Sequence, residues 1–222
     1  MLSYLFRLLE IIFDFIASCI YFISARLKGI KKHANILLIG PTNSGKTTLA
    51  HVLRTKFRRD PDPDYLDRDA SGPYGTHVDF GGTRFQFIDT GGFAAPPLSW
   101  FFPQADGIVF LVDAAQEAQW YRETNGMLRE VLGDKQLIGI PVVIIGNKID
   151  HPNAVSTEEL IQLMELDEGR LDVVRRERAI EVVMASVVLN QGLRVLLERL
   201  SQHVNESAFH NVAQRRKQET GR

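Results

Sequence analysis

The chain has 222 residues, with 26 basic and 27 acidic side chains, a formal net charge of −1 and 45% hydrophobic residues. This length fits one domain with short appendages, and the composition excludes a disordered chain. A single cysteine excludes a disulfide framework and a multi-cysteine zinc site, and the balanced charge argues against a nucleic-acid partner.

Charge is distributed unevenly along the chain. Residues 1–33 carry five basic and two acidic side chains and residues 205–222 carry four and two, so the segment 34–204 has a net charge of −6. Basic ends on an acidic body suit a protein whose ends contact an anionic surface. No apolar period persists after residue 204, which predicts a disordered tail over 205–222.

The N-terminal segment predicts a membrane-associating helix. Plotted at 100° per residue, residues 2–25 form a polar strip and a wide apolar face. Glu10 and Asp14 interrupt the apolar run and basic residues follow it, which is the wrong order for a signal peptide. The longest charge-free run, 15–25, is short for a spanning helix. We expect an amphipathic helix at the lipid surface; a spanning helix and a helix packed on the protein's own core stay open as alternatives.

After residue 33, buried apolar runs alternate with helical periodicity. Strands are expected at 35–39, 76–80, 84–88, 107–112, 141–145 and 180–185, and helices at 46–57, 116–132, 157–164 and 193–200. The two glycines at 81–82 predict a hairpin, and 58–75 is predicted to be a long loop. The alternation predicts an α/β fold with a mostly parallel central sheet and helices on both faces.

Residues 40–47 read GPTNSGKT, a full match to the phosphate-binding pattern G-x-x-x-x-G-K-[ST] between a predicted strand and a predicted helix. Glycines there let backbone N–H groups close around phosphates, and the helix N-terminus adds its dipole. Lys46 would reach the β- and γ-phosphates, and Thr47 would bind Mg²⁺. The other candidate phosphate ligands are Gly40, Asn43, Ser44, Gly45 and Thr48.

A second motif, DTGG at 89–92, ends the third predicted strand. The Asp89 carboxylate would hold Mg²⁺ through water, and the Gly92 N–H would meet the γ-phosphate.

A third motif, NKID at 147–150, follows the strand at 141–145. The Asp150 carboxylate can accept two hydrogen bonds from the N1–H and the exocyclic amine of guanine, a donor pair that adenine lacks. Lys148 would pack its stem over the base, and Asn147 would brace the loop. A later loop, with Ser186 and Val187, would offer backbone N–H groups to guanine O6.

In this order the motifs resemble the small GTPases of the Arf/Sar family, and the Sar type above all, over residues 33–203. The stretches GIVFLVDAA, NKIDHPNAVSTEEL and IEVVMASVVLNQG carry the likeness. Leu2 excludes N-myristoylation, which also fits the Sar type rather than the Arf type.

The resemblance implies a P-loop small-GTPase fold with an N-terminal amphipathic helix that enters the membrane when GTP binds. It implies a GTP/GDP switch that uses Mg²⁺ as a cofactor. The implied location is the cytosolic face of the endoplasmic reticulum and the Golgi apparatus. Coat protein complex II and an exchange factor are the implied partners, and guanine nucleotide and membrane lipid are the implied ligands.

The sequence departs from the family on the γ-phosphate side. Phe93 stands where the family has the His or Gln that orients the attacking water. The prolines at 96–97 disfavour a helical switch. The family's Pro-Thr pair aligns with 73–74, so Thr76 would supply the Mg²⁺-sensing hydroxyl only if the register shifts, and Thr42 replaces an Asp. These changes predict a guanine-nucleotide binder with weak intrinsic hydrolysis.

Two other functions stay open. One is a membrane-anchored docking subunit resembling the beta subunit of the signal recognition particle receptor, and the other is a non-hydrolysing pseudo-GTPase scaffold. An ATP-specific enzyme is disfavoured, because the motif at 147–150 would then be a coincidence.

Overall fold

The computed structural model describes residues 32–56, 74–91, 97–166 and 178–220. The chain divides into two compact units, Met1–Lys32 and His33–Arg222. Of the first unit only Lys32 is described, so the predicted amphipathic helix lies outside the described residues. Within the described ranges, no helix is long and apolar enough to cross a membrane.

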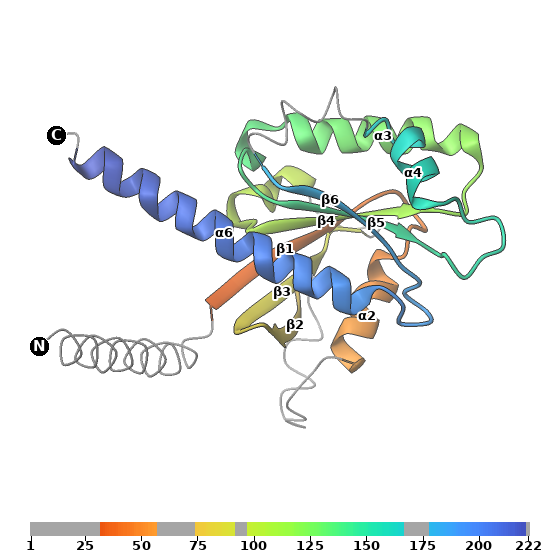
Figure 1. The fold of residues 1–222 in the computed structure, drawn as a ribbon, viewed down its shortest axis with the longest axis horizontal. Coiled ribbons are helices and arrows are strands. Elements are labelled where there is room, and N and C mark those ends of the chain that lie inside the picture. Colours follow the sequence, from red (N-terminus) through yellow and green to blue (C-terminus); the bar gives the residue numbers. More distant parts are fainter. Residues whose placement is uncertain (1–31, 57–73, 92–96, 167–177, 221–222) are drawn as a thin grey trace, which may run out of the picture. The chain divides into compact units, whose positions relative to one another are not determined.

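Six strands form one sheet in the order β2-β3-β1-β4-β5-β6 (Figure 1). They are β1 (Lys32–Ile39), β2 (Tyr74–Phe80), β3 (Thr83–Asp89), β4 (Gly107–Asp113), β5 (Val142–Asn147) and β6 (Ile180–Met184). The last three strands and β1 run parallel, and β2 is antiparallel to β3. β4 and β5 are buried along nearly their whole length, because helices cover both faces of the sheet. The predicted α/β fold is confirmed.

The predicted hairpin is also present. Gly81 and Gly82 join β2 to β3 with φ angles of 59° and 82°. Two successive left-handed residues match the right-handed twist of the flanking strands, which explains why the sequence places two glycines there.

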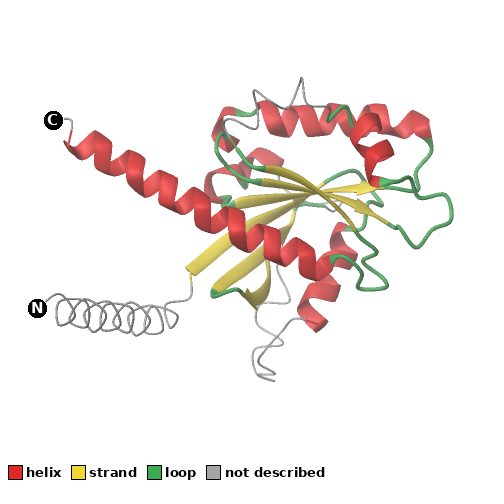
Figure 2. Cartoon of the chain, viewed as in Figure 1, coloured by secondary structure: helices red, strands yellow, loops and turns green. Residues whose placement is uncertain are grey.

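Among the described residues, four α-helices cover the sheet: α2 (Lys46–Lys56), α3 (Ala118–Gly133), α4 (Thr157–Leu163) and α6 (Leu193–Thr220). Figure 2 shows α2 and α6 on one face and α3 and α4 on the other. Each face has its own apolar core, and neighbouring strand residues such as Leu37 and Leu38 point into different cores. Helix α4 begins with a capping box, in which Ser156 exchanges reciprocal hydrogen bonds with Glu159.

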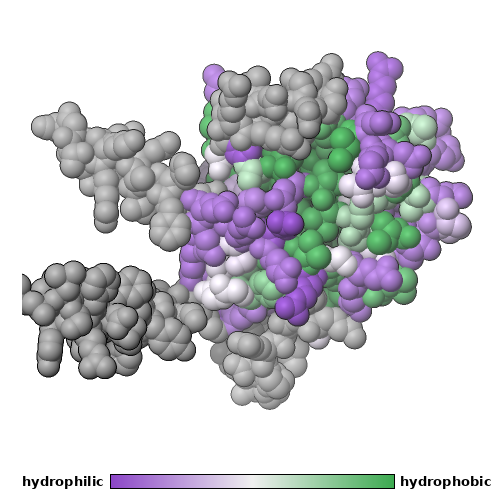
Figure 3. Space-filling view, viewed as in Figure 1, coloured by the Kyte–Doolittle hydropathy of each residue, from purple (hydrophilic) through white to green (hydrophobic). Residues whose placement is uncertain are grey.

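The structure corrects the expectation for the C-terminal tail. Instead of ending near residue 200 before a disordered segment at 205–222, α6 continues to Thr220. Its first part, to Val204, packs on the sheet, and periodicity detects only such a buried face. Beyond it the sequence is rich in Ala, Gln, Arg, Lys and Glu, residues with a high intrinsic helix propensity. In Figure 3 hydrophilic residues cover the described outward side of α6.

The part of the chain that the structure describes also has three short 3₁₀ helices that were not predicted: η2 (Leu98–Trp100), η3 (Phe102–Gln104) and η4 (Lys135–Leu137). Single turns of this kind are too short to show a hydrophobic period. They nevertheless place Phe102 and Leu137 in the core shared with α3.

Candidate functional site

The phosphate loop connects β1 to α2, as the motif predicts. Gly40 has a φ of 147°, and a Cβ on it would lie 2.3 Å from the carbonyl oxygen of Leu111. Gly45 has a φ of 102°, and a Cβ there would lie 2.3 Å from Nδ2 of Asn147. Both positions therefore need glycine for conformation and for space, because neighbouring strands approach the loop closely.

Lys46 begins α2 with its ammonium group enclosed by its own loop. Its Nζ donates to the carbonyl oxygens of Gly40 and Pro41 at 2.8 Å each. Burial lowers the pKa of Lys46, and the nearby Asp89 carboxylate acts in the opposite direction. The side chain is buried, with 9% exposed, so its charge is poorly screened within the loop that would bind phosphate.

Asp89 and Thr47 meet at the first turn of α2. The Thr47 hydroxyl donates to Oδ2 of Asp89 at 2.5 Å, and the Gly91 N–H donates to Oδ1 at 3.0 Å. Two oxygen ligands suited to Mg²⁺ thus converge beside the phosphate loop. Their proximity follows from the sheet order, in which β3 lies next to β1.

Thr76, the third candidate Mg²⁺ ligand, is not brought to this pair. Thr76 lies on the edge strand β2 opposite Phe87, and β3 separates that strand from β1. Gly92 and Phe93 lie outside the described residues. Thr48 is exposed on α2, one residue beyond Thr47.

Asn147 links the two halves of the candidate site. Its Nδ2 donates to the Ser44 carbonyl oxygen at 2.8 Å, and its Oδ1 accepts from the Val187 N–H at 3.1 Å. The residue is 3% exposed, so both bonds are shielded from water. One side chain therefore holds the phosphate loop and the loop after β6 at a fixed separation.

Lys148 is held by a residue that the sequence analysis did not single out. Its Nζ lies 2.6 Å from Oδ2 of Asp113, the last residue of β4. In the sheet register Asp113 pairs with Asn147, which places the carboxylate next to the NKID motif. The sequence could have indicated Asp113, because it directly follows a predicted strand, and the residues at the carboxyl ends of neighbouring parallel strands lie close together. Asp150 is exposed at the turn that follows.

The loop after β6 holds the two residues that are expected near guanine O6. Ser186 and Val187 are both buried, and their N–H groups donate within the protein, to the Gln191 carbonyl oxygen at 3.2 Å and to Asn147. Donation from these groups to guanine O6 stays a prediction, which would require one of these bonds to be exchanged.

Comparison of the sequence with known proteins identifies the family to which a site of this kind belongs. A family model described as the ADP-ribosylation factor family matches residues 20–204. The chain is 30% identical to "Small COPII coat GTPase SAR1" of Giardia intestinalis, over 73% of this chain and 85% of that protein. It is 29% identical to "Small COPII coat GTPase SAR1B" of Dictyostelium discoideum, over 77% and 86%. It is 27% identical to "ADP-ribosylation factor-like protein 3" of Caenorhabditis elegans, over 73% and 83%. The chain thus belongs to the Arf/Sar family of small GTPases, which bind guanine nucleotides.

Proposed function

We propose that this protein is a Sar-type GTP/GDP switch that is recruited to the membrane of the endoplasmic reticulum. There it would act in assembly of coat protein complex II and in transport to the Golgi apparatus, with coat proteins and an exchange factor as partners. The observation that carries the nucleotide assignment is Asn147, which braces the phosphate loop and the loop after β6 together. Two of the similar proteins are named as small COPII coat GTPases, which supports the Sar-type role.

The residues of the site have separable roles in this proposal. Lys46 would exchange its bonds to loop carbonyls for bonds to phosphate oxygens, which carry a full negative charge. Lys148, held by Asp113, would lie over the base, and Asp150 would select guanine. Mg²⁺ fits the oxygens of Thr47 and Asp89, and when bound it would neutralise phosphate charge.

Intrinsic hydrolysis is expected to be slow, because the Phe93 side chain has no group that can orient a water molecule. Multiple-turnover GTPase assays at saturating Mg²⁺, with the Giardia relative assayed in parallel, would measure this. We expect a rate well below that of the relative. A rate equal to the relative's, and unchanged in Phe93→Ala, would contradict the proposal.

Membrane recruitment is expected to depend on the nucleotide and on residues 1–33. In flotation with anionic liposomes, we expect the full chain to bind with a non-hydrolysable GTP analogue and to be released with GDP. Ile16→Glu, on the apolar face of the predicted helix, should abolish binding because it places a charge in lipid, whereas Ser18→Glu on the polar strip should not. Binding with both nucleotides that resists alkaline carbonate would instead indicate a spanning anchor, as in the receptor-like alternative.

A further inference from the structure

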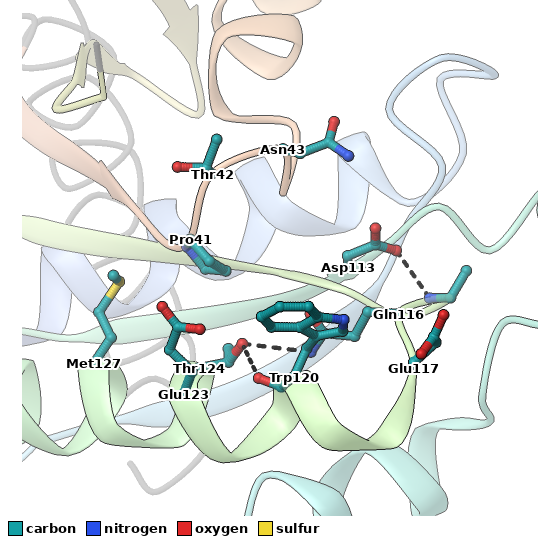
Figure 4. Close-up of a pocket in the computed structure, with 11 residues that line it drawn as sticks. Pro41, Thr42, Asn43, Asp113, Gln116, Glu117, Trp120, Glu123, Thr124 and Met127 are labelled. Carbon is teal, nitrogen blue, oxygen red and sulfur yellow. Dashed lines mark hydrogen bonds between the residues drawn. The ribbon is translucent and has the colours of Figure 1, made fainter. Parts of the chain in front are cut away.

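A cavity of about 550 Å³ lies beside the phosphate loop, on the side facing α3. Figure 4 shows the loop residues Pro41, Thr42 and Asn43 along one side and Trp120, Glu123 and Met127 of α3 along the other. The three α3 residues are spaced three and four apart, so they share one face of the helix. This face adjoins the buried face of α3, which carries Tyr121 and Leu128, and Met127 packs against the same core.

The cavity combines an exposed aromatic ring with carboxylates. Trp120 is 52% exposed, although large aromatic side chains are usually covered in a folded protein. Glu117 and Glu123 line the same cavity and are exposed, and among the described residues that line it there is no Lys, Arg or His. The third lining carboxylate, Asp113, is already paired with Lys148. The lining therefore places two exposed carboxylates next to a π face. Glu117 accepts a hydrogen bond from Nε2 of Gln119 at 3.0 Å, and Arg122 lines an adjoining hollow together with Trp120 and Glu123.

The floor of the cavity is fixed by hydrogen bonds. The buried Thr124 hydroxyl donates to the Trp120 carbonyl oxygen at 3.0 Å and accepts from Nε2 of Gln116 at 3.4 Å. These bonds tie the first turns of α3 to the segment that follows β4. The indole is thus presented on a well-supported helix and not on a loose loop.

We propose that this cavity binds a cationic side chain, arginine above all, from an extended segment of a partner protein. A guanidinium group would stack on the Trp120 ring and pair with the Glu123 carboxylate, and Glu117 would add negative potential. Charge complementarity favours this occupant, because the exposed carboxylates would repel an acidic segment and would form no ion pair with a neutral one. Since Thr42 and Asn43 form the opposite wall, the partner would contact the nucleotide-binding loop itself.

Fluorescence of Trp120 tests the proposal in the full chain. The protein has two tryptophans, so Trp100→Phe leaves Trp120 as the single reporter. The probe is a short acetylated Gly-Arg-Gly-Arg-Gly amide, and its neutral match replaces both arginines by citrulline. We expect saturable quenching by the arginine peptide, weakened by added salt, and no saturable response to the citrulline peptide.

A matched pair of variants completes the experiment. Glu123→Gln should weaken binding of the arginine peptide about threefold, the range expected for one exposed ion pair. Glu130→Gln makes the same change on the exposed side of α3 outside the cavity, and it should leave binding unchanged. Equal quenching by the citrulline peptide, or equal binding by the two variants, would overturn the proposal. The amount of guanine nucleotide bound to the same samples tests the nucleotide binding of the proposed function separately from peptide binding.

Discussion

Asp150→Asn is expected to lower affinity for GDP by about a hundredfold or more and to create a preference for xanthine nucleotides. The Asp150 carboxylate is exposed at the turn after the NKID motif, where the proposed nucleotide site places the base. Losing two charge-assisted hydrogen bonds, each worth about 1.5–3 kcal/mol, accounts for this loss. An asparagine can accept from xanthine N1–H and donate to the C2 carbonyl oxygen, so the same substitution fits the other base.

Equilibrium titration with fluorescent analogues of GDP and of xanthosine diphosphate measures the change in base preference. Glu158→Gln provides the matched control, since it removes an exposed carboxylate from the first turn of α4 without touching the proposed base site. This control should bind GDP like the unmodified protein. If Asp150→Asn changed neither affinity nor base preference, the assignment of guanine to this turn would be wrong.

Asn147→Ala is expected to cost about 3 kcal/mol in the free energy of unfolding and to accelerate GDP dissociation strongly. The substitution removes the acceptor of the Val187 N–H and the donor to the Ser44 carbonyl oxygen. Both backbone groups belong to buried residues, and an unsatisfied buried group costs about 1–3 kcal/mol. The phosphate loop would also lose the side chain that lies against Gly45.

Chemical denaturation with and without GDP, together with the dissociation rate of a fluorescent GDP analogue, measures both effects. Asn153→Ala is the control, because Asn153 is exposed in the loop after the same motif and should change stability by less than about 0.5 kcal/mol. Comparable stability and comparable dissociation rates in the two variants would show that Asn147 does not brace the site.

Local signals explain why much of the fold was predictable. β4 and β5 are buried apolar runs, the two-glycine turn specifies its hairpin, and the capping box at Ser156 marks the start of α4. The phosphate loop was also recognisable, because its glycines are required at fixed spacing whatever surrounds them. The outer half of α6 was missed because its sequence has no hydrophobic period.

The sequence by itself determined the family and the succession of strands and helices along the chain, and it predicted the residues that would hold phosphate, because these depend on short patterns along the chain. Only the tertiary structure decided which side chains from distant parts of the chain contact one another. Parallel strand register placed Asp113 beside Lys148, and packing of separate loops joined Asn147 to Ser44 and Val187. The cavity between the phosphate loop and Trp120 has the same origin, since segments distant in sequence form its two walls.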